Sequence, residues 1–449
     1  MKGLNARLGL VGLALPVVLA SCARYVPQPI DPVARATRLD ARRLDDPGLT
    51  RFLTALGHPA PRWRIGTLTL VAVYERPDLR IAVAAAAVAR GHLISVRAIP
   101  NPVLGLSPTY DTAAGLPSPI KIGPIVDFVV SSFGSRAAAS AAARARIAAA
   151  RAAIMSAAWR ERARVRDALL GVWQTRAQAR LAARAAANAT AVVRVLAQRE
   201  AAGMIATPVV TSARLSAAQA RFAAVEAVRR QALAMTVLAA AIGMPAAALE
   251  GIPLDLAAFH RVVAPRHLTT MVRVALVDRP VVIAALAQYQ AAQDGLRLAI
   301  DRQYPGFTIG PGYHYDEGAN KFLLALSLPL PVFNQNQGPI ATARAQRRLA
   351  AARFEAAQAQ VLAQIDQARR DWRTSRVVAL AADRSVRRAD RAVAEADQAF
   401  RAGAIGRLRW LGARQSADFA FQEALTARAQ ERAALGQLED ATHQRLLTR

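Results

Sequence analysis

Few residues of this 449-residue chain have the types and spacing that catalysis or metal binding requires. The sequence contains no G-x-S-x-G nucleophile motif, no P-loop and no H-E-x-x-H zinc motif. Its six histidines are scattered, and the two nearest in sequence, His260 and His267, lie seven residues apart across Pro265. A single cysteine cannot assemble a thiolate zinc site. We therefore expect no enzyme activity, no metal site and no cofactor.

Cys22 is the one residue whose position indicates a chemical modification. It directly follows Leu19-Ala20-Ser21, and an apolar stretch from Leu8 to Val18 lies upstream behind a basic start. This segment resembles a bacterial lipoprotein signal, whose cysteine is acylated and becomes the first residue after cleavage. We therefore expect residues 1–21 to be a signal peptide and Cys22 to anchor the chain in the outer membrane. An ordinary signal peptide with a chance cysteine is the alternative.

Positive charge dominates the composition, with 59 Lys and Arg against 31 Asp and Glu, a net charge of +28. Such a balance can indicate a nucleic acid or an anionic membrane as partner. Here the arginines are spread along alanine-rich helical segments, so solvated helix faces explain them. A basic, helical rod that binds nucleic acid or serves a structural role remains an alternative, which the signal peptide opposes.

The sequence from about residue 67 onward contains an internal duplication. Arg76-Pro77 recurs 203 residues later as Arg279-Pro280. Further proline, tyrosine and glycine positions recur, and these residue types are not subject to the chance matches that alanine gives. Pro102, Pro108 and Tyr110 recur 203 residues later as Pro305, Pro311 and Tyr313. Gly203 and Ile205 recur 200 residues later as Gly403 and Ile405. We therefore expect an N-terminal segment (22–66), a first repeat (67–245), a linker (246–267) and a second repeat (268–449).

Each repeat is predicted to contain a helix, two strands, a very long helix and a return helix. The predicted helices span 68–98, 135–202 and 211–242 in the first repeat, and 268–302, 338–402 and 407–447 in the second. Larger apolar residues recur at steps of four and seven in the long segments, with alanine at most other inward positions. This pattern is typical of helices packed side by side at close range.

Four segments alternate between apolar and small or polar residues, at about 102–111, 120–130, 306–316 and 321–333. Each is close to the roughly 9–11 residues of a tilted membrane strand. An open sheet edge is not tolerated in lipid, and bacterial barrels have at least eight strands. Two chains would supply eight strands and three chains would supply twelve. Half-buried hairpins on a soluble domain are the alternative interpretation.

This organisation resembles the TolC-type outer-membrane efflux proteins over almost the whole chain after the signal. The resemblance rests on the order of four features: Arg76-Pro77-Asp78, Leu238 to Pro245, Leu328 to Gly338 (LPLPVFNQNQG) and the glycines of the two predicted tips. The third feature is similar to the heavy-metal efflux branch. The resemblance implies a mainly α fold with a small membrane β-barrel portion: a homotrimer whose twelve-stranded barrel, four strands per chain, continues into an α-helical barrel.

The resemblance also implies where the functional residues lie. The periplasmic tips, which contact an adaptor protein, would be Gly203, Met204, Ile205, Gly403, Ala404 and Ile405; the strand-to-helix junction would be Phe333, Asn334, Asn336 and Gly338. Many relatives carry two aspartates just after the second tip, where this chain has Arg409 and Gly412. Arg407 and Arg409 would then either line the pore constriction or point outward into solvent, and the sequence leaves both open.

The expected function is that of an outer-membrane exit duct in a tripartite efflux system. The duct would passively conduct metal ions or small toxic compounds that arrive from an inner-membrane pump, of the resistance–nodulation–division type, through a periplasmic adaptor. The partners are therefore two further copies of the chain, the adaptor, the pump and outer-membrane lipid, and not nucleic acid. A TolC-like channel for protein or peptide export is the alternative.

Overall fold

A computed structural model describes residues 23–110, 112, 120–260, 268–316 and 319–447. The chain divides after Arg43 into two units. In the first unit a single short helix, α2 (Pro32–Asp40), is described. The Asp31 side chain starts it by accepting hydrogen bonds from the amides of Val33 and Ala34. None of its residues is buried.

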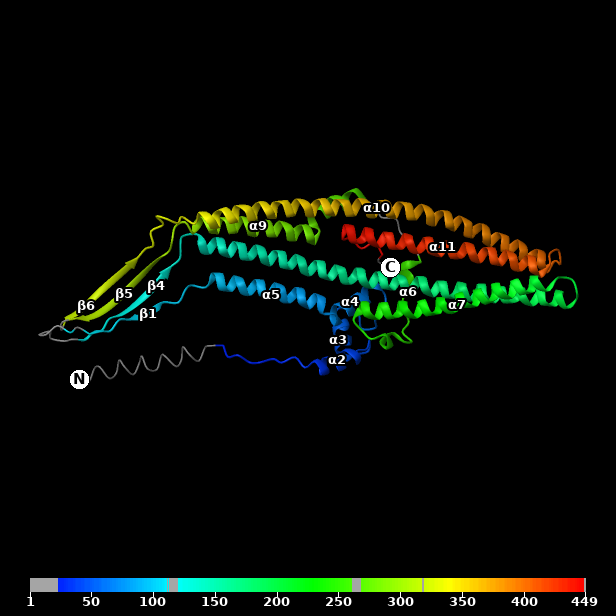
Figure 1. Cartoon of the computed structure of the whole chain (residues 1–449), viewed down its shortest axis with the longest axis horizontal. Coiled ribbons are helices and arrows are strands. Elements are labelled where there is room, and N and C mark those ends of the chain that lie inside the picture. The colour runs from blue at the N-terminus through cyan, green and yellow to red at the C-terminus, as the bar shows by residue number, and fades with distance from the viewer. Residues whose placement is uncertain (1–22, 111, 113–119, 261–267, 317–318, 448–449) are drawn as a thin grey trace. The chain divides into compact units, whose positions relative to one another are not determined.

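The second unit, from Leu44 onward, repeats one series of elements (Figure 1). After α3 (Pro47–Ala55), the first series is α4 (Ile65–Glu75), α5 (Pro77–Arg97), β1 (Val103–Leu106), β2 (Thr109–Tyr110), β3 (Ile120–Lys121), β4 (Pro124–Val130), α6 (Ser135–Ala201) and α7 (Thr207–Ile242). Two 3-10 turns, η1 (Ala246–Leu249) and η2 (Ala257–Phe259), follow. The second series is α8 (Leu268–Asp278), α9 (Pro280–Asp301), β5 (Phe307–Asp316), β6 (Ala319–Ser327), α10 (Gln337–Arg401) and α11 (Arg407–Thr442).

The two series match in length as well as in order. Helices α4 and α8 have 11 residues each, α6 and α10 have 67 and 65, and α7 and α11 have 36 each. A helix of 67 residues is about 100 Å long at 1.5 Å per residue. The duplicated order that the sequence predicts is therefore present in the structure.

The first helix of each repeat differs from the prediction. We expected single helices over 68–98 and 268–302, but each is broken into two at the Arg-Pro pairs. Proline has no amide hydrogen and excludes the preceding residue from helical geometry, so Arg76 is extended, with φ −82° and ψ 143°. Pro77 and Pro280 then begin new helices at the position where proline is favoured.

The strands form an antiparallel sheet in the order β1-β4-β5-β6, so the two repeats meet at the β4–β5 pair. The strands expected over 102–111 and 120–130 are each interrupted, and two of their parts, β2 and β3, pair in a separate two-stranded sheet. The strand expected over 321–333 ends at Ser327. Pro329 and Pro331 cannot donate to a ladder, which explains the early end.

The main core lies halfway along α6, where the helices of both repeats meet. It joins Val165, Leu169 and Val172 of α6 to the end of α7 and to α3, α4, α10 and α11. Toward the strands α6 buries small residues instead, among them Ala138, Ala142 and Ala143, and this allows neighbouring helices to approach closely. The core thus holds the long helices at their middle, and a smaller cluster of Leu296, Ala299, Ile340 and Ala343 packs the start of α10 against α9.

Helix α5 is the one described helix long and apolar enough to cross a membrane by length and composition. Ala86 is its only buried residue, and Ile81, Val88 and Ile94 are exposed. An exposed apolar helix in a single chain indicates a face that another surface covers.

Candidate functional site

The four-stranded sheet has one apolar face and one face, here called the polar face, that mixes small and polar residues with Ile125, Val129 and Leu323. In the β5–β6 ladder, Ile309 pairs with Leu326 and Tyr313 with Phe322 on the apolar face. Thr308 pairs with Ser327, Gly310 with Ala325 and His314 with Lys321 on the other. Phe322 is 84% exposed and Leu326 69% exposed. The alternation that the sequence predicts is therefore confirmed, and the apolar face points away from the rest of the chain.

Three glycines on the polar face accommodate the side chain of Ile125. A Cβ atom at Gly105, Gly310 or Gly312 would lie 3.0 to 3.2 Å from carbon atoms of Ile125. Asp127, on the same strand and face, would be 2.4 Å from a Cβ at Gly310. Because the glycines have no side chains, Ile125 and Asp127 fit on this face of the sheet without steric clash.

Strands β1 and β6 end the sheet, so in a single chain each has an unpaired edge among the described residues. Such edges pair readily with other strands. This feature, together with the exposed apolar face, is what a strand set needs if several copies are to close a membrane barrel.

The strand-to-helix junction of the second repeat centres on Asn336. This residue adopts a left-handed conformation, with φ 62°, and precedes α10. Its Nδ2 donates to the carbonyl oxygen of Ala299 at 2.6 Å, and its amide donates to Asn334 Oδ1 at 2.9 Å. Phe333 is fully exposed and Gly338 lies in open space. The junction motif therefore fixes the start of α10 against the end of α9.

Gly134 fills the equivalent position in the first repeat, 202 residues earlier, with φ 77°. A Cβ there would lie 2.9 Å from a carboxylate oxygen of Asp301, also at the end of α9. Both long helices therefore begin with a left-handed residue against the same helix end. The sequence alone did not reveal this second junction residue.

The two predicted tips have the same backbone structure. Gly203 and Gly403 have φ values of 69° and 72°. In the first tip, Met204 N donates to Arg199 O at 2.9 Å, and in the second Ala404 N donates to Ala399 O at 2.8 Å. This pattern closes a helix end through a left-handed glycine. Met204, Gly403 and Ala404 are exposed, whereas Ile205 and Ile405 are half-buried under the turns.

Only the second tip has an aromatic clamp. Phe400 and Trp410 stack with their ring centroids 5.2 Å apart, and Trp410 Nε1 donates to Asp397. Arg414 covers the Trp410 ring at 4.8 Å. The first tip has Val210, fully buried, at the place of Trp410. The α10–α11 hairpin thus ends with a stacked aromatic pair at the place where the α6–α7 hairpin has a buried valine.

Arg407 and Arg409 lie in the first turn of α11 and are both exposed. Leu411, two residues further on, is buried, so Arg409 lies on the side of α11 opposite to the packed one. Arg409 shares this exposed side with Gly412 and Ser416. No described carboxylate forms an ion pair with either arginine.

The two hairpins are joined laterally near the tips. Asn188 Nδ2 donates to the carbonyl oxygen of Leu411 at 3.2 Å, and Arg184 pairs with Asp418 at 3.1 Å. Burial raises the pKa of Asp418, whereas the nearby Arg184 and Arg414 lower it. These contacts connect α6 to α11, so the tips are held as one unit within the chain.

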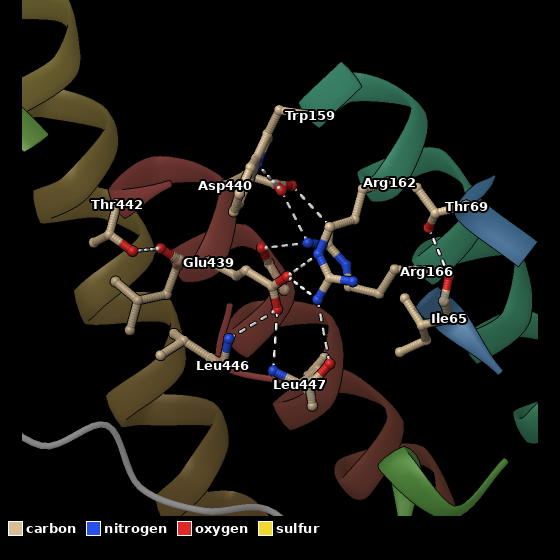
Figure 2. Close-up of polar contacts among 12 residues, drawn as sticks. Ile65, Thr69, Trp159, Arg162, Arg166, Glu439, Asp440, Thr442, Leu446 and Leu447 are labelled. Atoms are coloured by element: carbon tan, nitrogen blue, oxygen red, sulfur yellow. Dashed lines mark hydrogen bonds and ion pairs between the residues drawn. The ribbon is translucent and has the colours of Figure 1, made fainter. Parts of the chain in front are cut away.

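A buried polar cluster that the sequence did not predict joins the middle of α6 to the end of α11 (Figure 2). Arg162 Nε donates to Glu439 Oε1 at 2.8 Å, and Glu439 Oε2 accepts from the amides of Leu446 and Leu447. Arg166 binds Asp440 with two hydrogen bonds of 2.9 and 2.7 Å. Arg162 and Arg166 lie one helical turn apart within a charged stretch that also contains Arg160, Glu161, Arg164 and Asp167, so no local pattern marked these two arginines as buried.

The same cluster holds His443, the residue that ends α11. Its ring stacks on Trp159 with centroids 4.5 Å apart, and Trp159 Nε1 donates to Asp440 at 3.0 Å. Burial, assisted by the charge of Arg279 and opposed by Asp440, lowers the pKa of His443 from 6.5 to about 4. The histidine is therefore neutral at physiological pH.

Cys22 and the expected signal peptide lie outside the residues that the structure describes. Among the described residues, no group of three His, Cys, Asp or Glu side chains could hold a metal ion. The remaining features are structural: a two-faced sheet, two junctions, two tips and the contacts that tie them together.

Comparison with known proteins decides which fold this is. Residues 271–442 match the outer membrane efflux protein family. Comparison with curated protein sequences gave no significant match.

Similar solved structures include three outer-membrane proteins. The outer membrane protein VceC of Vibrio cholerae is 20% identical with a TM-score of 0.66, over 88% of this chain and 97% of VceC. The CmeC outer membrane channel of Campylobacter jejuni is 13% identical with a TM-score of 0.66, over 94% of both chains. The open MtrE outer membrane channel of Neisseria gonorrhoeae is 19% identical with a TM-score of 0.63, over 85% of this chain and 89% of MtrE.

The resemblance to TolC-type proteins is thus confirmed at the level of the fold. The closer similarity to the heavy-metal branch stays a prediction.

Proposed function

We propose that this chain is one subunit of an outer-membrane exit duct that serves a tripartite efflux system. The observation that carries the proposal is the combination of a two-faced, open-edged sheet with two long helical hairpins in one chain. Substrates such as small toxic compounds or metal ions would reach it from an inner-membrane pump of the resistance–nodulation–division type through a periplasmic adaptor. The duct itself would be passive and need no catalytic residue.

A homotrimer is the assembly that this geometry supports. Four strands from each of three chains make a twelve-stranded barrel, which removes the edges of β1 and β6 and leaves room for a lumen. The apolar face with Leu326 would contact lipid, and the face with Asp127 would line the lumen. Along α7, Phe222, Val225 and Val237 are exposed, and a neighbouring copy would cover them.

Two measurements on the same sample test the proposal. Native mass determination of the full-length protein in detergent should give three chains per particle. Planar bilayers with the same sample should show discrete, long-lived conductance steps. A stable monomer would contradict barrel closure, and a trimer without conductance would contradict the duct.

The tips are proposed to receive the adaptor, with Gly203 and Gly403 at the farthest points from the strands along each hairpin. Small side chains such as Ala404 allow close approach of another backbone. Cross-linking from cysteines introduced at Met204 and Ala404 should capture an adaptor, whereas a cysteine at the strand residue Leu326 should not.

Arg407 and Arg409 are proposed to stand near the constriction of the periplasmic mouth. Three copies of each would repel one another, by about 1 kcal/mol per pair at 4 Å in water. Arg409→Asp should therefore shift single-channel conductance toward cations and create block by multivalent cations. Unchanged ion preference and block would place Arg409 outside the pore.

Lipidation of Cys22 is proposed from the sequence alone. Acyl chains add about 0.8 kcal/mol per buried CH₂, so a multiply acylated terminus stays in the membrane. Mass spectrometry of the mature N-terminal peptide should find the lipid on Cys22, and an unmodified cysteine would contradict lipidation. Cys22→Ala should slow maturation rather than abolish insertion, since the barrel also holds the protein.

A further inference from the structure

A cavity of about 590 Å³ lies beside Trp173, halfway along α6. Helices α6 and α7 and the segment from Leu254 to His260 surround it. Its lining residues are Trp173, Arg176, Arg180, Gln231, Leu254, Asp255, Leu256, Ala257 and His260. Its volume falls within the 300–1,000 Å³ of typical small-molecule sites.

Two arginines on successive turns of α6 line this cavity. Arg176 is half-buried, and its Nη2 lies 3.9 Å from the Met235 sulfur. Arg180, four residues later, is exposed. Within the described part of the chain neither one forms an ion pair with a carboxylate. The one acid in the lining, Asp255, instead accepts a hydrogen bond from the amide of Ala257 at 3.0 Å.

Trp173 and His260 form the aromatic part of the cavity lining, and further side chains pack behind them. Trp173 is 8% exposed, and Arg432 covers its ring from α11 at 5.1 Å. His260 meets the Trp173 ring edge-on, with centroids 6.5 Å apart, and Phe259 lies 6.3 Å away. Arg432 Nε also donates to the carbonyl oxygen of Phe259 and so fixes the turn that carries His260.

A second cavity of about 350 Å³ shares Trp173 and His260 with the first. Its charged lining residues are Arg376, Arg428, Arg432, Asp383 and Glu431. Arg428 pairs with Asp383 and Arg432 with Glu431, which leaves Arg376 without an ion pair among the residues described. Positive charge therefore predominates on both sides of the Trp173–His260 pair.

We propose that the larger cavity binds a small amphipathic organic anion, with Arg176 and Arg180 holding its carboxylate, sulfonate or phosphate group. Arginine pairs well with such groups because its planar fork donates parallel hydrogen bonds. The apolar body of the ligand would lie on Trp173, Leu254 and Leu256. An uncharged aromatic compound would leave the two guanidinium groups unpaired and bind less tightly.

The site is distinct from the features assigned to the duct. Trp173 is 38 residues from the start of α6 at Ser135 and 28 from its end at Ala201. At 1.5 Å per residue these separations are about 57 and 42 Å. The proposed ligand site therefore involves neither the barrel nor the mouth, so it can be tested independently of the proposed function.

Titration of the full-length, detergent-solubilised protein with 2-naphthalenesulfonate tests the proposal, with isothermal calorimetry as the readout. We expect one saturable site per chain, and 2-naphthalenemethanol, the uncharged comparator, should bind at least tenfold more weakly. Each of Arg176→Gln and Arg180→Gln should weaken sulfonate binding about tenfold, as expected for loss of a charged hydrogen bond. Arg194→Gln, an exposed arginine further along the same helix, is the control and should bind as the wild type.

The variants change half-buried or exposed side chains, so circular dichroism and particle mass should match the wild type. Equal affinity for the sulfonate and the alcohol would overturn the proposal. So would unchanged binding in the Arg176→Gln and Arg180→Gln variants, or an equal loss in Arg194→Gln, which would mean binding to general positive charge.

Discussion

Arg76 Nε lies 2.9 Å from Glu161 Oε2 and ties the break before α5 to the middle of α6. At the second Arg-Pro break, Arg279 Nη1 donates to Gln364 Oε1 of α10 at 2.8 Å. Each break is therefore held to the long helix of its own repeat, by a carboxylate in the first repeat and by a neutral amide in the second. Glu161 is 1% exposed, whereas Gln364 is exposed. Water can therefore take the place of either partner in the neutral Arg279–Gln364 hydrogen bond.

Gln364→Glu should create an ion pair with Arg279 in the second repeat. Burial lowers the pKa of Arg279, and a carboxylate beside it would favour its charged form. We expect a gain of up to about 1 kcal/mol in the free energy of unfolding, the range of partly exposed pairs. Thermal unfolding in detergent at low salt measures it. Gln360→Glu, one turn earlier on α10, adds the same charge without the contact and should show no gain.

Glu439→Gln should be strongly destabilising. Glu439 is 0% exposed and is the carboxylate partner of Arg162, so its removal leaves a buried guanidinium without a counter-charge. Breaking a buried pair in this way costs about 3–5 kcal/mol. Denaturant titration of the solubilised protein would show it. Glu226→Gln, which breaks a pair with Arg229 at the surface, should have little effect; similar losses in both variants would contradict the assignment.

His443 should make stability depend on pH in the acidic range. Its pKa is about 4 in the folded chain and 6.5 as a free side chain, so the unfolded chain takes up the proton first as pH falls. The stabilisation is complete above about pH 6.5 and is lost between pH 6.5 and 4, by up to about 3 kcal/mol.

His443→Asn tests this dependence, because asparagine tolerates the left-handed backbone at this position, with φ 53°, and cannot be protonated. The melting temperature of the variant should fall less than that of the wild type between pH 7 and pH 4.5. Equal slopes would show that His443 does not contribute.

The tip glycines should be required for their backbone geometry alone. A Cβ at Gly203 or Gly403 has open space around it, but the φ values of 69° and 72° disfavour any other residue. Gly203→Ala should cost about 1–2 kcal/mol locally. Hydrogen exchange of the amides at residues 199–207 should then be faster. Gly412→Ala, in the interior of α11, should instead slow exchange slightly, since alanine favours a helix.

The two faces of the sheet should respond differently to charge. Leu326→Arg places a guanidinium on the apolar face and should cost up to about 2–4 kcal/mol in a bilayer. Ser327→Arg, the next residue, lies on the face of Thr308 and Gly310 and should be tolerated. Urea titration of protein folded in lipid vesicles compares them. Equal costs would mean that the apolar face does not contact lipid.

Local patterns in the sequence are enough to predict the repeating series of elements. Alternation at Phe307, Ile309 and Tyr313 defined strand β5, and glycine at 203 and 403 marked both tips. These signals are local, because the period of two in a strand and the conformational freedom of glycine depend on neighbouring residues alone. The breaks at Pro77 and Pro280 were equally local, and the prediction of unbroken helices there was wrong because it gave periodicity more weight than proline geometry.

Contacts between residues far apart in the sequence could not be predicted in this way. Arg162 and Glu439 lie 277 residues apart, and an alanine-rich sequence offers many registers in which α6 and α11 could pack. The register that forms is the one that pairs every buried charge of this cluster and leaves space at Gly436 for Arg166, since a Cβ there would lie 2.7 Å from the guanidinium. The same register places Arg432 of α11 over the Trp173 ring of α6 at 5.1 Å. The free energy that selects this register comes from side-chain contacts between α6 and α11, and no local pattern in either helix predicts those contacts.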